Sequence, residues 1–255
     1  VRPRRLTTMR YLILSDLHSN LEALTAVLAH VPEYDHLLFL GDLIGYAATP
    51  NEVIQRVRRL KPTAIIRGNH DKVCSGVENG DNFNANALLS AMWTKEQLNP
   101  RNLEYVRSLP AGPLRVDPLI TICHGSPMDE DYYILYENDA YLSFQCFDTT
   151  ICLFGHTHVP GLFVLEERNS SFYYFIPRDR FEAKLDLSGQ TRYLINPGSV
   201  GQPRDYDPRA SCVVLDTDQA VITFLKIPYD IGKTVRRIQL SNLPGFLADR
   251  LLSGV

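Results

Sequence analysis

The order of secondary structure can be predicted from residues 10–20, which read RYLILSDLHSN. The apolar run at 11–14 predicts a short buried strand, and the polar residues after it predict that the strand ends near Ser15. Beyond this strand, apolar residues recur at helical spacing, at Leu21, Leu24, Val27, Leu28 and Val31. The stretch therefore predicts a strand followed directly by a helix.

The same pattern repeats in the next part of the chain. Residues 36–40 predict a second strand, residues 50–60 a helix with Pro50 at its first position, and residues 63–66 a third strand. Strands that alternate with helices at this rhythm are typical of right-handed βαβ units, which build a parallel sheet.

The rest of the chain has a different texture. Helices are predicted over residues 84–98, 99–109, 230–240 and 244–252, and two short strands at 119–123 and 151–154. Short strands separated by turn residues follow at 162–165, 172–176, 193–195, 212–215 and 221–225, and they predict an antiparallel second sheet. We expect one domain over residues 9–255, with residues 1–8 as an extension ahead of Met9 and residues 131–147 as a tyrosine-rich insertion.

Composition excludes several classes of protein. The 255 residues are 45% hydrophobic and 22% charged, which is typical of a globular protein. A net charge of −3 gives no field that would grip nucleic acid or an anionic membrane, so neither is expected as a partner. No apolar run reaches the roughly 20 residues that a membrane span needs. The five cysteines lack CxxC spacing and are expected to be reduced thiols, which favours a cytoplasmic location.

Polar motifs stand at the ends of the predicted strands. They include five of the seven histidines and are Asp16-Leu17-His18, Gly41-Asp42, Gly68-Asn69-His70-Asp71, His124-Gly125 and Gly155-His156-Thr157-His158. Because the carboxyl ends of parallel strands meet in one crevice, motifs far apart in the sequence are expected to converge there.

Imidazole and carboxylate together form the ligand set of Zn, Mn or Fe, and the absence of cysteine from these motifs argues against a structural zinc site. The set holds more candidate ligands than one ion takes at about four to six coordination. Two ions that share a bridging carboxylate would use them all. The sequence therefore predicts a binuclear metal site.

These motifs resemble, in order and in residue type, the signature of the calcineurin-like metallophosphoesterases. The segment at 196–204, NPGSVGQPR, is similar to a stretch in small prokaryotic members of that family, the YfcE-type phosphodiesterases and diadenosine-tetraphosphatase-like proteins. The resemblance implies an α/β (mixed α+β) fold of two packed, mixed β-sheets flanked by helices.

The resemblance also implies a role for each motif residue. Asp16, His18 and His158 would hold one metal, Asn69, His124 and His156 the second, and Asp42 would bridge the two. His70 would be the general acid. Mn is the expected metal, and Fe, Zn and Ni accept the same ligands. Two such ions lower the pKa of a bridging water, so that hydroxide attacks the phosphoryl group near neutral pH.

The expected function is hydrolysis of a small phosphate ester or nucleotide, foremost a phosphodiester. The alternatives are a dinucleoside polyphosphate hydrolase and a protein or phosphomonoester phosphatase. The protein-phosphatase alternative is disfavoured because Leu43-Ile44-Gly45-Tyr46 follows Asp42 in place of Asp-Arg-Gly. A non-catalytic scaffold of the same fold is least expected, since scaffolds of this family lose ligands. The sequence does not predict the oligomeric state.

Other residues have weaker signals. Asn20, Tyr46 and Arg204 adjoin the motifs and are candidate substrate contacts. The aromatic residues of the insertion fit either of two interpretations, a part of the core or a stacking pocket for a nucleotide base, and they are Tyr132, Tyr133, Tyr136, Tyr141 and Phe144. Asp71 is expected to support the loop that carries His70.

Overall fold

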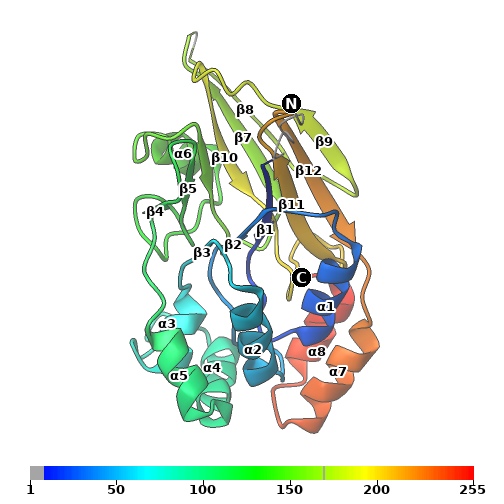
Figure 1. The fold of residues 1–255 in the computed structure, drawn as a ribbon. Helices are drawn as coiled ribbons and strands as arrows, with labels where there is room; N and C mark the ends of the chain where they lie inside the picture. Colours follow the sequence, from blue (N-terminus) through cyan, green and yellow to red (C-terminus); the bar gives the residue numbers. More distant parts are fainter. Residues whose placement is uncertain (1–8, 169) are drawn as a thin grey trace, which may run out of the picture.

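The strand predicted at residues 10–15 forms as β1 (Arg10–Leu14) and lies in the middle of a six-stranded sheet. The computed structural model describes residues 9–168 and 170–255, which contain two such sheets and eight helices (Figure 1). The predicted extension at residues 1–8 lies outside the described residues. None of the helices in the described part of the chain is long and apolar enough to cross a membrane.

The first sheet combines parallel and antiparallel strands. In spatial order it consists of β3 (Ala64–Ile65), β2 (His36–Phe39), β1, β11 (Ala210–Asp216), β12 (Val221–Ile227) and β9 (Phe181–Lys184). The pairs β1–β2 and β2–β3 are parallel, as the βαβ pattern predicts, whereas β11 runs antiparallel to β1 with Leu12 opposite Val214.

The second sheet is mixed as well. In spatial order it consists of β4 (Leu114–Arg115), β5 (Ile120–Ile122), β6 (Ile151–Leu153), β10 (Thr191–Asn196), β7 (Gly161–Glu166) and β8 (Ser171–Phe175). The pairs β5–β6 and β6–β10 are parallel, and the other pairs are antiparallel. The prediction that the late strands form one antiparallel sheet was therefore wrong, because they are divided between the two sheets.

The division follows from burial. Residues of β1 alternate between two cores: Leu12 and Leu14 pack with the apolar residues of the helices, while Tyr11 and Ile13 pack between the sheets. A strand buried on both faces and in the middle of a sheet needs a partner on each edge. The fully buried strand β11 supplies the partner opposite β2.

Most helices lie together at one end of the sheets, and α6 lies apart from them beside β5 (Figure 1). Their bounds are α1 (Leu21–His30), α2 (Pro50–Leu60), α3 (Asn69–Ser75), α4 (Ala85–Gln97), α5 (Pro100–Arg107), α6 (Glu137–Ser143), α7 (Ile231–Leu240) and α8 (Phe246–Ser253). The sequence patterns missed α3 and α6, which have seven residues each and are too short to show helical periodicity.

Candidate metal centre

The loops that follow five strands bring all seven predicted ligands together. Asp16 and His18 follow β1, Asp42 follows β2, Asn69 begins α3 after β3, His124 follows β5, and His156 and His158 follow β6. Six of the seven are buried, and Asn69 is half-buried. The strands come from both sheets, so the site lies where the two sheets end side by side.

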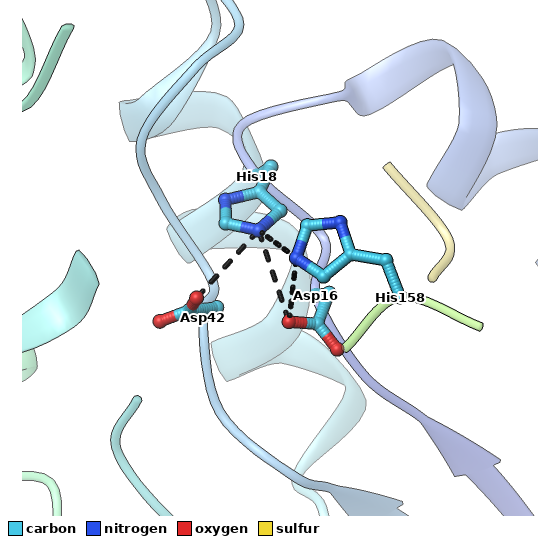
Figure 2. Close-up of side chains that lie close together, drawn as sticks. All are labelled: Asp16, His18, Asp42 and His158. Carbon is cyan, nitrogen blue, oxygen red and sulfur yellow. Dashed lines mark hydrogen bonds and ion pairs between the residues drawn. The ribbon is translucent and has the colours of Figure 1, made fainter. Parts of the chain in front are cut away.

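Four of these side chains form the first cluster (Figure 2). The Nε2 atoms of His18 and His158 lie 3.1 Å apart. His158 Nε2 is 3.2 Å from Asp16 Oδ1, and His18 Nε2 is 3.6 Å from Asp42 Oδ2. All four side chains are at most 2% exposed, so water does not screen them.

The other ring nitrogen of each histidine fixes its tautomer. His18 Nδ1 lies 3.2 Å from the Ile44 carbonyl oxygen, and His158 Nδ1 lies 2.6 Å from the Gln202 carbonyl oxygen. A carbonyl oxygen only accepts, so each Nδ1 must be the donor. Burial lowers the pKa of both imidazoles, which are therefore neutral near pH 7. Each Nε2 is then an acceptor, and the cluster consists of acceptors alone.

The second cluster consists of Asp42, His124 and His156, with Asn69 beside them. His124 Nδ1 donates to the Leu40 carbonyl at 2.8 Å, so His124 Nε2 faces Asn69 Oδ1 at 3.2 Å and Asp42 Oδ2 at 3.4 Å. Burial would lower the pKa of His124, but the Asp42 carboxylate outweighs it and raises the pKa to about 10.

His156 is oriented the opposite way. Its Nε2 donates to the Asp131 carbonyl at 3.0 Å, which leaves Nδ1 as the free acceptor. Burial lowers the pKa of His156 to about 3, so this imidazole is neutral as well. Main-chain carbonyls thus set the tautomer of every histidine among the predicted ligands, which is the usual support of a metal-binding imidazole.

Each of the two carboxylates, Asp16 and Asp42, accepts a main-chain hydrogen bond with one oxygen and leaves the other oxygen unpaired. Asp16 Oδ2 accepts from the His156 amide at 3.2 Å, and Asp42 Oδ1 accepts from the His70 amide at 2.9 Å. The second oxygen of each, Asp16 Oδ1 and Asp42 Oδ2, is buried without a hydrogen-bond partner among the described residues. Buried, unpaired carboxylate oxygens beside the neutral imidazoles of His18, His156 and His158 fit divalent cations. Asp42 belongs to both clusters.

The backbone is strained at these positions. Asp16, His18, Asp42, His156 and His158 all have φ between 45° and 65°, in the left-handed region. This conformation costs a residue with a Cβ roughly 1–2 kcal/mol. Surrounding packing maintains the strain and turns the side chains toward the site.

Two glycines make room for the carboxylates. A Cβ on Gly68 would lie 2.1 Å from Asp42 Oδ1, and a Cβ on Gly155 would lie 2.0 Å from Ser15 Oγ and 2.7 Å from Asp16 Oδ2. Only glycine lets the backbone approach so closely. Gly68 is also the residue before α3, whose first turn carries Asn69 and His70.

His70 lies next to the first cluster, outside both. Its ring contacts those of His18, Tyr46 and Phe83, with centroids 4.9, 4.4 and 4.6 Å away. Burial is the main reason that its pKa falls to about 4. Asp71 accepts from the amides of Leu43 and Gly68, both at 3.0 Å, and so links the loop after β2 to the loop that carries His70.

Arg204 adjoins the same rings. Its Nη2 donates to the Tyr46 hydroxyl at 3.3 Å and to Gln202 Oε1 at 3.1 Å, and its Nε is buried without a partner. Among the described residues no carboxylate lies within ion-pair distance of it. The structure thus keeps an uncompensated cation beside the metal centre, which fits an anionic ligand.

Asn20 has a structural place. Its side chain accepts from the Ala23 amide at the start of α1 and donates to the Gly201 carbonyl and the Tyr229 hydroxyl. The expectation that Asn20 contacts substrate was therefore wrong, because its amide group already has partners.

The aromatic residues of the insertion do not act as one group. Tyr133 stacks on His156 with centroids 3.7 Å apart, and Phe144 is fully buried in a core cluster. All four tyrosines of this group, Tyr132, Tyr133, Tyr136 and Tyr141, are exposed. Phe144 thus belongs to the core, whereas a stacking pocket for a nucleotide base stays a prediction.

Sequence reasoning missed the support of His156. The Asp131 carboxylate lies 2.6 Å from Lys72 Nζ, which is itself 2% exposed and also pairs with Glu78 and Glu130. This ion-pair network ties residues 130–131 to α3, and so holds the carbonyl that orients His156. The sequence gives no signal for this network, because Lys72 and the acidic residues at 130–131 are far apart in the chain and form no motif.

Comparison with known proteins shows similarity over nearly the whole chain. Residues 9–220 match the model of the calcineurin-like phosphoesterase superfamily domain. An uncharacterized protein of Methanocaldococcus jannaschii is 34% identical over 95% of this chain and 97% of its own length. The crystal structure of a metallophosphoesterase from Sphaerobacter thermophilus is 40% identical, with a TM-score of 0.83 over 97% of this chain and 100% of that one.

A crystal structure of a hypothetical protein from Pyrococcus horikoshii shares the fold. It is 20% identical with a TM-score of 0.74, and it covers 97% of this chain and 99% of its own. The family match spans most of the chain, including every strand that leads into the site. The resemblance in the motifs is therefore confirmed, and the chain belongs to the calcineurin-like phosphoesterase superfamily.

Proposed function

We propose that the protein is a hydrolase of phosphate esters that depends on two divalent metal ions, and that its substrates are phosphodiesters. The observation that carries this proposal is the pair of acceptor clusters that share Asp42. Asp16, His18 and His158 would hold one ion, and Asn69, His124 and His156 the other. When bound, such ions neutralise the phosphoryl oxygens and acidify water. Mn is the metal to test first.

Two residues outside the metal clusters would bind the phosphoryl group and protonate the leaving group. Arg204 would bind a non-bridging phosphoryl oxygen, since its guanidinium has no carboxylate partner and a charged hydrogen bond is the strong kind. His70 lines a cavity of about 520 Å³ next to the centre, where the leaving group would lie.

Hydrolysis forms one bond from a water oxygen to phosphorus and breaks the bond to the leaving oxygen. The leaving oxygen takes a proton from His70, and the proton released by water restores it. With a pKa of about 4, His70 is neutral in the free chain. The negative charge of a bound phosphate ester beside the ring would raise this pKa and so favour the protonated acid.

The test compares bis-p-nitrophenyl phosphate with p-nitrophenyl phosphate, with added Mn and with a chelator, alongside elemental analysis. We expect turnover of the diester, loss of that turnover with chelator, and about two metals per chain. Faster turnover of the monoester would favour the phosphomonoesterase alternative. Absence of both metal and turnover would contradict the proposal and favour a scaffold.

A further inference from the structure

The cavity beside His70 is acidic. It measures about 520 Å³ and lies between the start of α3, the loop 77–84, the start of α4 and Tyr133. Its lining includes three carboxylates, Glu78, Asp81 and Asp131, and the amides of three asparagines in the loop. No lysine or arginine is among the lining residues. For a cavity next to a phosphoesterase site, this charge is unexpected.

Two cations outside the cavity lining, Lys72 and Arg67, compensate only part of the negative charge of the cavity. Lys72 pairs with Glu78 at 2.8 Å and with Asp131 at 2.6 Å, and its side chain is 2% exposed. Arg67 pairs with Glu130 at 2.8 Å. Both cations are thus engaged with carboxylates. The Asp81 carboxylate is exposed and has no hydrogen-bond or ion-pair partner among the described residues, so its charge acts on whatever enters the cavity.

The opposite charge lies elsewhere in the site. Arg204, which has no carboxylate partner among the described residues, adjoins Tyr46 and Tyr133 at the edge of the cavity and does not itself line it. Tyr46 separates the two regions, because its ring contacts His70 while its hydroxyl accepts from Arg204. The site is therefore polarised, with a cation where the phosphoryl group would be bound and carboxylates where the leaving group would be released.

We propose that the cavity selects substrates whose leaving group is an uncharged, hydroxyl-rich alcohol, and rejects those whose leaving group carries further phosphates. This inference rests on the proposed phosphodiesterase function. Hydroxyl groups of a sugar or a polyol donate to carboxylate and amide oxygens such as those of Asp81 and Asn82. A phosphate in the same place would face three carboxylates, with no lysine or arginine among the lining residues, and like charges brought together oppose binding.

A set of three dinucleotides tests the charge of the leaving group at constant chemistry. Thymidylyl-thymidine is compared with the same molecule carrying a terminal 3′-phosphate and with the one carrying a terminal 5′-phosphate. The scissile diester is unchanged, and the products show which thymidine leaves. We expect a phosphate on the leaving thymidine to lower kcat/KM about tenfold or more, chiefly through KM, and a phosphate on the retained thymidine to change it little.

Reversal of one charge tests the cavity itself. A phosphate on the leaving thymidine is expected to lower kcat/KM by a factor at least about threefold smaller in Asp81→Lys than in the parent. Glu104→Lys makes the same charge change at an exposed position of α5 that does not line the cavity, and it should leave the penalty and the basal activity unchanged. Because Asp81 is exposed and without a partner, the variant is expected to fold.

A separate measurement identifies which class of alcohol the cavity accepts as the leaving group. Bis(glycerol) phosphate offers a hydroxyl-rich leaving group without a base. Turnover comparable with that of thymidylyl-thymidine would identify polyols in general as leaving groups, and turnover of the dinucleotide alone would identify nucleosides. The first result supports the preference for hydroxyl-rich alcohols, and the second would contradict it while leaving the rejection of charged leaving groups to the dinucleotide series.

Failure of this inference can be told from failure of the proposed function. If bis-p-nitrophenyl phosphate and thymidylyl-thymidine are hydrolysed but the terminal phosphate brings no penalty, or the Asp81→Lys variant keeps the full penalty, selection by the cavity is excluded and the phosphodiesterase stands. If the metal-loaded protein hydrolyses none of these diesters, both fail.

Discussion

The Nε2 atoms of His18 and His158 lie 3.1 Å apart and both are acceptors, because each ring donates through Nδ1 to a main-chain carbonyl. Two lone pairs at this distance, with the Asp16 carboxylate beside them, repel one another in a site that excludes water. A cation placed between them turns this repulsion into attraction. The arrangement therefore links metal binding to stability.

Removal of metal is expected to lower the stability of the fold. A ligand that binds only the native state stabilises it by about 2.7 kcal/mol at a concentration of a hundred times Kd. Thermal unfolding should be measured once with excess Mn and once with excess chelator. Tm is expected to be several degrees lower with chelator, and added Mn should restore it. An identical Tm in both states would contradict the cluster as a metal site.

Gly68→Ala is expected to disrupt the metal centre. The new Cβ would lie 2.1 Å from Asp42 Oδ1, so the carboxylate shared by the two clusters must move. Elemental analysis should show loss of at least one metal per chain, with a loss of turnover. Gly245→Ala is the matched control, since its Cβ would meet no atom within 4 Å and its φ is −57°. Full metal content in Gly68→Ala would refute the proposed bridging role of Asp42.

His70→Ala should keep both metals and lose most turnover, because the ring lies outside both clusters and lines the cavity. Loss of a general acid costs about 10²–10⁴ in rate. The measurement is kcat on the diester beside elemental analysis, with His30→Ala as the control at an exposed helix end. A parallel loss of metal and activity would show that His70 supports the centre instead.

Arg204→Met should lower kcat/KM on diesters about 10- to 100-fold without loss of metal. Loss of a charged hydrogen bond costs about 1.5–3 kcal/mol. Because the guanidinium has no carboxylate partner, its removal should not lower Tm. Arg180→Met, which removes an exposed arginine paired with Glu182, is the control. Unchanged kinetics in Arg204→Met would exclude contact with the phosphoryl group.

The network around Lys72 predicts a pH dependence of stability. Burial raises the pKa of Glu130, but its hydrogen bonds to Arg67 and Lys72 outweigh burial and lower it. A depressed carboxyl pKa gives stability that is present above the unfolded value of about 4.3 and is lost as the pH falls below it.

Glu130→Gln removes this contribution. Urea unfolding of the metal-free protein should therefore show the variant less stable than the parent at pH 7, and the gap should close toward pH 3. A gap that stays constant over this range would mean that the charge of Glu130 does not stabilise the fold.

Several features could be predicted from the sequence because they depend on local residue types. The apolar runs predict β1, β2 and β3, and polar residues of metal-ligating type follow them, as Asp16 and Asp42 show. The ends of parallel strands converge for geometric reasons, so the gathering of these residues could be expected as well.

Other features required the tertiary structure. The carbonyls of Ile44, Asp131 and Gln202 select which histidine nitrogen faces the centre, and a main-chain carbonyl leaves no mark in a sequence. The pairing of β1 with β11 joins residues about two hundred positions apart. The division of charge between Arg204 and the cavity of Asp81 depends on which side chains the fold brings together.

The sequence thus determined the chemistry of the site, since ligand types and strand ends are local properties. The tertiary structure decided which way each histidine lone pair points and where the positive and negative charges of the site lie, because both arise from contacts between segments that are distant in the chain.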